Sequence, residues 1–336
     1  MRRSSVRNLC IKDLCAKGFD QETGIWFECP GYSMVTLKDL AKLAKRLEKE
    51  LNIDLFEEIP VLRKAFAAAK EYLFPDGMLI GFGDTHPGPL PEEVCSLQFA
   101  ADFNAETRRC EDAEIFIKKS LCDSASPRLC VENNSKPQPS TFFHAPNASW
   151  LVARSGMDAK DDIAFALNAS LGNHQHANGI SLELYANGYR IAPDAGIGWN
   201  LYSGDDYKEY YSRFPAHNTV MVNSRSDYAP MKSFHPFKLV AHGDNWASVR
   251  FREPATGAEQ ERTVIMVKDG DAHYFVDCFK SRVEGDEEQY HDYYYHNFGD
   301  TLSFEGETEP TEEIAFPLFI AVASDTGWRQ KRFTGF

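Results

Sequence analysis

The chain has 336 residues, of which 43% are hydrophobic and 26% charged, and its formal net charge is −14. This composition is typical of a globular protein with one large or two smaller domains, and it excludes disordered and collagen-like chains. The acidic balance disfavours nucleic acid as a partner. The longest apolar run, 314–323, is short and contains a proline, so no membrane span is predicted.

The first 120 residues are predicted to be helical. Apolar side chains recur every three to four residues over 36–51, which indicates an amphipathic helix, with Thr36 at its cap. A second helix is expected over 57–74, a third after Pro91 and a fourth near 111–120. Short links between such helices favour antiparallel hairpins.

The pattern changes after a polar, proline-rich stretch at 123–140. Strands are then predicted at Ser149–Arg154, Ile163–Ala169, Ile180–Ala186, Thr219–Val222, Ala247–Phe251, Arg262–Val267 and His273–Phe279. Many strands without intervening helices predict an antiparallel β-sandwich. The expected fold class is therefore α+β and multidomain: helical over 1–125, a linker over 126–140 and a sandwich over 141–336.

Histidines and an aspartate gather in the turn-rich part of the β region. His174 and His176 are two residues apart, which places them on one face if they lie on a strand. Asp194 and His217 follow at distances that suit neighbouring strands returning to the same place. Two imidazoles and one carboxylate from three strands predict a Zn²⁺ site, completed by water or another group.

A cupin-like metalloenzyme is a competing interpretation of the histidine pair. A cupin has a glutamate four or five residues after the second histidine, whereas the next acid here, Glu183, is seven residues after His176. That spacing and the helical first half disfavour a cupin. In a cupin-like enzyme the metal would do the chemistry.

The eight cysteines form no CxxC pair and no zinc-finger spacing. Cys122 and Cys130 flank a Ser/Pro-rich loop and would pair in an oxidising compartment, although scattered reduced thiols are an equal alternative. The first ten residues carry arginines without an apolar core after them, so they do not form a signal peptide.

Several segments together resemble the heparinase II/III family of polysaccharide lyases. The resemblance is carried by HQHANGISLELYANG (174–188), APDAG (192–196) and AHNTVMVN (216–223). It extends to GIWFECPGYS (24–33), PDGMLIGFGDTHPG (75–88), APNASWLVARSG (145–156) and the segment 273–296. It implies an (α/α) toroid followed by an antiparallel β-sandwich, with 1–125 as the C-terminal part of the toroid.

The resemblance also implies roles for individual residues. It makes Tyr32 and His174 catalytic, and it assigns a mainly structural zinc ion to His176, Asp194 and His217. It places Glu28 near the cleft, while Asn178 stands where relatives often carry an aspartate. Further substrate contacts are expected from Tyr202, Tyr210 and Arg213, the last through bidentate binding of a carboxylate.

The implied reaction is β-elimination on a uronate-containing polysaccharide, alginate or a glycosaminoglycan, by a carbon–oxygen lyase of the EC 4.2.2 type. Neutralising the uronate carboxylate raises the acidity of the C5 proton, and a tyrosine oxygen takes that proton. The basic excess over 1–70 allows a locally positive cleft in an acidic protein.

The family's asparagine motif upstream of the tyrosine has no counterpart before Tyr32. The chain is therefore expected to be part of a longer lyase, with the first part of the toroid and some final strands missing. The alternative function is a catalytically incomplete, carbohydrate-binding fragment with structural zinc. Exposed toroid faces would favour self-association. The family resemblance implies a periplasmic or secreted protein.

Overall fold

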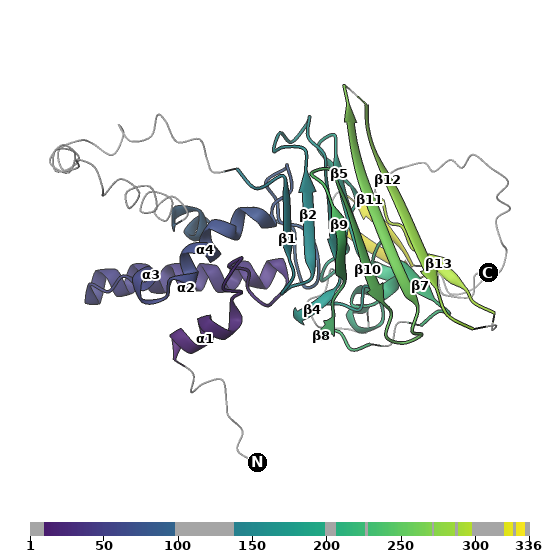
Figure 1. The fold of residues 1–336 in the computed structure, drawn as a ribbon. Helices are drawn as coiled ribbons and strands as arrows, with labels where there is room; N and C mark the ends of the chain where they lie inside the picture. The colour runs from purple at the N-terminus through teal and green to yellow at the C-terminus, as the bar shows by residue number, and fades with distance from the viewer. Residues whose placement is uncertain are drawn as a thin grey trace, which may run out of the picture.

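The computed structural model of the protein describes residues 10–97, 138–198, 206–225, 228–270, 272–285 and 288–297, and the backbone of 319–324 and 327–332. Within these ranges helices come first and antiparallel strands follow (Figure 1). No helix in the described ranges is both long and apolar enough to cross a bilayer. The mixed helical and antiparallel character predicted for the chain is confirmed.

The helical layer consists of α1 (Ile11–Gly18), α2 (Pro30–Leu51), α3 (Leu55–Glu58), α4 (Val61–Ala68) and the 3₁₀ turn η2 (Ala69–Tyr72). The predicted helix over 36–51 is present as α2, but its predicted start is wrong. Pro30 occupies the first turn and Cys29 is the N-cap, so Thr36 lies inside the helix and caps nothing. Proline suits this position because a first-turn N–H has no intrahelical partner.

The predicted single helix over 57–74 is divided into three short elements. Asp54 caps α3 by accepting the N–H of Phe56, and α3 ends before Pro60, which precedes α4. The chain then tightens into η2. Residues 92–97 after Pro91 are helical as predicted. The predicted fourth helix at 111–120 and most of the linker lie outside the described residues.

Two antiparallel sheets contribute side chains to one apolar core (Figure 1). The five-stranded sheet has the order β1 (Phe142–Ala145), β2 (Trp150–Arg154), β3 (Ala164–Asn168), β5 (Ser181–Ala186) and β6 (Tyr189–Ala192). The four-stranded sheet has the order β12 (Ala272–Arg282), β11 (Glu259–Asp269), β10 (Trp246–Arg252) and β9 (Lys238–His242). All seven strand regions predicted from the sequence contain a strand.

The five-stranded sheet is covered on both faces, which explains its nearly continuous apolar strands. Along β2, Trp150 and Val152 pack against the helical layer, whereas Leu151 and Ala153 pack against the second sheet. Side chains alternate between faces along a strand, so a strand buried on both sides must be apolar throughout. One face of this sheet thus belongs to the core shared with the helices, and the other face belongs to the core shared with the second sheet.

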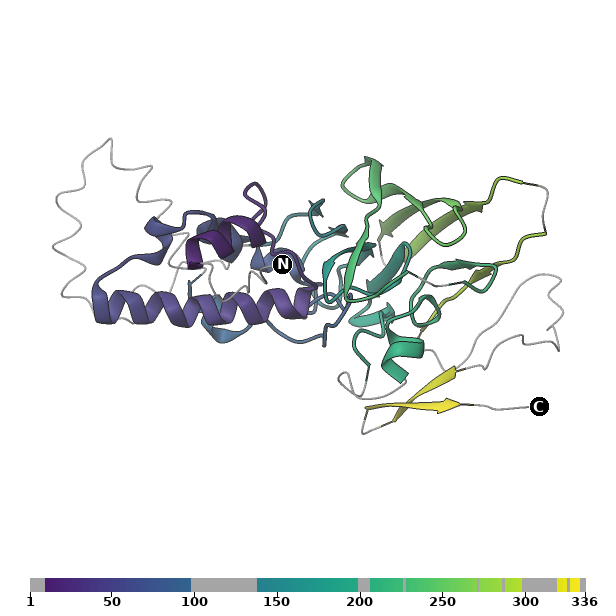
Figure 2. The same cartoon turned by 90° about the horizontal axis from the view of Figure 1, so that it is seen from below.

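In the described ranges, shorter strands form three separate two-stranded antiparallel sheets. β4 (Ser170–Asn173) pairs with β8 (Lys232–His235), and β7 (Val220–Val222) pairs with β13 (His291–Tyr293). β14 (Phe319–Ser324) pairs with β15 (Gly327–Arg332). The N-terminal end of α2 lies against the sheets and its far end points away from them (Figure 2). Residues after β4 and residues before α2 therefore meet.

Candidate functional site

The candidate site lies where the segment leading into α2 contacts the end of β4. Glu28 and Asn173 form a parallel bridge, and the N–H of Asn173 donates to the carbonyl of Phe27 at 3.1 Å. Gly172 has a φ of +114°, and a Cβ there would lie 2.6 Å from the Phe27 carbonyl oxygen. The backbones approach this closely because glycine has no side chain.

This junction brings Tyr32 and His174 together. Tyr32 lies in the first turn of α2, and its ring stacks on His174 with centroids 3.6 Å apart and an interplanar angle of 4°. Glu28 Oε1 lies 3.5 Å from His174 Nδ1 and also accepts from Asn173. Burial opposes ionisation of Glu28, but the combined interactions with His174, Trp26 and Asn173 outweigh burial and lower the pKa of that carboxyl.

Both side chains of the Glu28–His174 pair remain partly accessible, at 15% and 22% of their surface. Tyr32 is half-buried. The arrangement therefore offers a carboxylate, an imidazole and a phenol at one accessible place. Such groups are suited to proton transfer to or from a bound molecule.

His174 is held by its backbone in a conformation that few side-chain-bearing residues adopt. Its φ is +56°, and its N–H donates to the carbonyl of Met231 at 2.7 Å. Its carbonyl in turn accepts the N–H of Asp84 at 3.0 Å. A φ of this kind costs energy and persists only where the surroundings fix it. The loop 81–85 is one of those surroundings.

Gly83 allows that loop to reach His174. Replacing it with alanine should lower the free energy of unfolding by about 1–3 kcal/mol more than the control replacement Gly77→Ala. Both glycines have positive φ, but a Cβ at Gly83 would lie 2.4 Å from the His174 carbonyl oxygen, whereas nothing lies within 4 Å of one at Gly77. Urea denaturation of both variants measures the difference. Equal losses would contradict the proposed steric cause.

Behind this accessible group lies a fully buried one around His176. His176 Nε2 is 2.9 Å from Asp84 Oδ1, and the same Asp84 oxygen accepts the hydroxyl proton of Tyr207 at 2.7 Å. Burial lowers the pKa of His176, and Asp84 only partly offsets this. Burial, strengthened by Asp84, raises the pKa of Tyr207. Asp84 therefore joins the helical layer to both site histidines.

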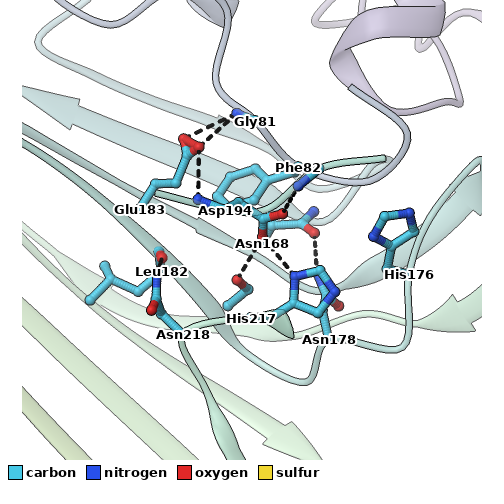
Figure 3. A network of polar contacts seen from close by, with 12 residues as sticks. Gly81, Phe82, Asn168, His176, Asn178, Leu182, Glu183, Asp194, His217 and Asn218 are labelled. Atoms are coloured by element: carbon cyan, nitrogen blue, oxygen red, sulfur yellow. Dashed lines mark hydrogen bonds and ion pairs between the residues drawn. The ribbon is translucent and has the colours of Figure 1, made fainter. Parts of the chain in front are cut away.

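Asp194 and His217 form a second buried pair. Oδ2 of Asp194 is 2.8 Å from Nδ1 of His217 and also accepts from Ser181. Burial disfavours the charged carboxylate, but His217, His176 and the N–H of Gly196 together outweigh burial and lower the pKa of Asp194. Figure 3 shows Asp194 beside His217, with His176 in the same region; the two imidazole centroids are 5.3 Å apart.

The donor atoms here match part of what zinc requires. His176 Nδ1 and His217 Nε2 are buried and have no hydrogen-bond partner, and a neutral imidazole nitrogen is a common zinc ligand. As they stand, however, no three His, Cys, Asp or Glu side chains within the described ranges are gathered closely enough to hold a metal ion. The zinc ion expected from the sequence stays a prediction.

The other sequence-derived candidates lie in different surroundings. Asn178 is fully buried, donating to Asn168 and accepting from Ser170. Tyr210 is packed in a small apolar cluster with Tyr211 and is 6% exposed. Arg213 donates to the backbone carbonyls of Lys208 and Tyr228. These contacts link the three residues to neighbours other than Tyr32 and His174. Tyr202 lies outside the described residues.

Two residues of the site were missed by the sequence analysis. Asp84 lies in the segment GFGDTHPG, which the sequence analysis used only as part of the family resemblance. Tyr207 is one of several tyrosines close together in the sequence, and nothing local distinguishes it. A lone aspartate between glycines is usually read as a turn residue. Only the fold shows that it lies against His176, which is 92 positions away in sequence.

Comparisons with known proteins are consistent with this architecture. The chain is 27% identical to an endo-acting ulvan lyase of Formosa agariphila, over 46% of this chain and 22% of the relative. Its fold is similar to that of a heparinase III gene product with methylated lysines (TM-score 0.58, 17% identity, 81% of this chain and 40% of the other). It is also similar to a mutant of heparan sulfate lyase HepC from Pedobacter heparinus (TM-score 0.51, 21% identity, 75% and 38%).

The chain thus spans less than half of the length of these relatives. Residues 137–305, half of the chain, match the model of the heparinase II/III-like C-terminal family. That segment contains β1 to β13 and both histidines of the candidate site. The chain therefore belongs to the heparinase II/III-like family.

Proposed function

We propose that the protein is a lyase module that cleaves a uronic-acid-containing polysaccharide by β-elimination. The observation that supports this most directly is the stack of Tyr32 on His174. It brings a phenol from the start of α2 against an imidazole just after β4, and both side chains are partly exposed to solvent. Membership of a family with polysaccharide lyases among its relatives supports the reaction class. The finer assignment of the helices to a partial α/α toroid and of the sheets to a sandwich belongs to the same proposal.

The proposed reaction removes the proton at C5 of the uronate and expels the 4-linked sugar. Tyr32 would take the proton and return one to the leaving oxygen, a role that general acid–base catalysis assigns to a positioned phenol. His174 would stabilise the charge that develops on the uronate carboxylate. Glu28 would hold His174 in position through the contact between their side chains.

The substrate is proposed to be an anionic polysaccharide. Alginate and glycosaminoglycans are the first choices, and ulvan and heparan sulfate join them because relatives are named for these sugars. Tyr202, Tyr210 and Arg213 are retained as proposed substrate contacts. A periplasmic or secreted location, and self-association through exposed apolar residues of α2 such as Val35 and Leu51, are also part of the proposal.

The test is a substrate panel with the purified chain. Alginate, ulvan, heparan sulfate and other glycosaminoglycans are incubated with the protein, and the ultraviolet absorbance of the unsaturated uronate product is followed. A rise on one polysaccharide is the expected result and identifies the sugar. A flat trace on every polysaccharide, with carbohydrate binding retained, would instead favour the incomplete, carbohydrate-binding fragment.

A zinc ion held by His176, Asp194 and His217 completes the proposal. When bound, it would stabilise the loops that present His174, as structural zinc does elsewhere. The two buried, unpartnered imidazole nitrogens support binding through His176 and His217. Asp194 contacts the other nitrogen of His217, Nδ1, at 2.8 Å, so its carboxylate would have to turn to reach the same ion. Asp84 would orient His176 through its other ring nitrogen, in the manner of carboxylates that orient zinc-bound histidines.

The purified protein should therefore contain about one zinc ion per chain. The variant His217→Ala should lose most of it, because a three-residue ligand set loses one imidazole. His242→Ala is the matched control, since that histidine is exposed on β9 and stacks on Phe142. Elemental analysis by mass spectrometry measures both. Zinc-free wild-type protein, purified with zinc present, would contradict the site.

A further inference from the structure

A buried carboxylate outside the proposed reaction lies beneath the site. Glu183 on β5 is fully buried, on the face of the strand opposite Leu182 and Leu184. Its carboxylate accepts the N–H of Gly81 at 2.8 and 3.0 Å and the N–H of Asp194 at 3.4 Å (Figure 3). The Glu183 side chain therefore binds two backbone N–H groups, that of Gly81 in the segment after the helices and that of the proposed zinc ligand Asp194.

Arg190 on the neighbouring strand β6 holds the same segment. Its Nη2 donates to the carbonyl of Leu79 at 2.7 Å, and its Nη1 is 3.5 Å from both carboxylate oxygens of Glu183. Its guanidinium also lies over the ring of Phe74, 5.0 Å from the centroid. Glu183 thus binds the N–H of Gly81, and Arg190 binds the carbonyl of Leu79, so that together they fix residues 79–81. We call this arrangement the 79–81 clamp.

The close fit of the clamp depends on glycine at position 81. A Cβ there would lie 2.5 Å from Glu183 Oε1, which is closer than atoms pack without displacement. The sequence analysis used Glu183 only to argue against a cupin. Its contacts give this carboxylate a different role, because a buried carboxylate without partners would destabilise the fold.

The segment that follows the clamp reaches both halves of the candidate site. The N–H of Asp84 donates to the His174 carbonyl at 3.0 Å. Thr85 Oγ1 accepts the N–H of Gly31, the residue before Tyr32, at 2.9 Å. Residues 81–85 therefore run from the clamp to the backbone on either side of the Tyr32–His174 stack.

We propose that Glu183 and Arg190 are positioning residues for the lyase reaction, which set the spacing of Tyr32 and His174 through residues 81–85. This inference rests on the proposed function. Glu183 is fully buried and Arg190 is 12% exposed, so they act on the reacting groups through the backbone. Small displacements of catalytic groups lower the rate strongly, since catalysis depends on their relative positions.

The test compares Glu183→Gln and Arg190→Gln with a matched control, Glu71→Gln. Glu71 is also buried, accepts the N–H of Ser140 at 3.0 Å and lies 3.4 Å from Arg154 Nη1. Glu71→Gln therefore makes the same side-chain exchange at another buried carboxyl beside an arginine, but its side-chain contacts are away from residues 79–85. Arg190→Gln also provides a readout if Glu183→Gln fails to fold.

Two measurements are made well below the unfolding temperature of each variant. The clamp variants should show kcat at least about tenfold lower with KM within about twofold of wild type. Amide hydrogen exchange over residues 79–85 should be at least about tenfold faster. Glu71→Gln should leave both quantities within about twofold of wild type, although it lowers the unfolding temperature.

Two results would overturn the inference. Unchanged exchange over residues 79–85 in a folded clamp variant would show that Glu183 and Arg190 do not fix the segment. Faster exchange with unchanged kcat would show that the clamp stabilises the fold without positioning the site. If the wild-type chain cleaves no polysaccharide, the proposed function fails, and the exchange measurement alone still decides whether the clamp exists.

Discussion

Replacing Tyr32 with phenylalanine should lower kcat at least about a hundredfold while the fold and the zinc content stay as in the wild type. The substitution keeps the ring that stacks on His174 at 3.6 Å and removes only the hydroxyl. Loss of packing is therefore excluded as the cause of the loss of activity. The proton at C5 would have no phenolic oxygen to accept it. The measurement is the rate of unsaturated product formation under saturating substrate.

Tyr189→Phe is the matched control for this experiment. Tyr189 is 73% exposed on β6, so removal of its hydroxyl should leave the rate unchanged. Circular dichroism and zinc analysis of both variants verify that the fold is retained. A Tyr32→Phe variant that keeps more than about a tenth of wild-type kcat would show that another group takes the proton. A metal-centred, cupin-like mechanism would then regain support.

The largest stability effect is expected at Arg262 on β11. This side chain is fully buried, and its Nη1 donates to the carbonyls of Ile180 and Asn218, both at 2.6 Å. Its Nε and Nη2 bind the two oxygens of Asp277 at 2.9 and 2.7 Å. Replacement with leucine would leave these groups without their partner, at a cost of about 3–5 kcal/mol. Asp277 is 18% exposed, so water offsets part of that cost.

The expected fall in unfolding temperature for Arg262→Leu is about 5 °C or more. Arg250→Leu on the adjacent strand is the control, because its ion pair with Glu261 at 2.7 Å is solvent-exposed and water already screens it, so its loss should change the unfolding temperature little. Differential scanning calorimetry measures both variants. Similar melting temperatures for the two would mean that Arg262 is not the link between the second sheet and the loop that carries His217.

The sequence predicts the strands of the central sheet well because of how they are buried. β2 and β3 are buried on both faces, and β11 alternates strongly, so each carries a clear pattern. The strands that were not predicted carry weaker patterns. β9 is mostly exposed and β6 has a single fully buried residue, Ala192. Such strands form because neighbouring strands pair with them, and that information is not local.

The start of α2 was misplaced because the apolar periodicity begins at Leu37, whereas the helix begins about two turns earlier, at Pro30. Pro30 at the first helical position was the available signal. The observed start matters for the site, since it places Tyr32 in the first turn of the helix, whereas the predicted start left it in a loop. The contact of Asp84 with His176 and the 79–81 clamp had no local signal, because each joins residues far apart in the sequence.

The segment that matches the family, 137–305, does not by itself bury all of its apolar surface. One side of its first sheet presents Trp150, Val152 and Tyr185 to the helices that precede it, and all three are fully buried there. Cut away from those helices, the sheet would expose this surface to water. The segment defined by homology and the unit that folds cooperatively are therefore different in this protein. The smallest fragment expected to fold includes the helices before residue 137 as well as the matched segment.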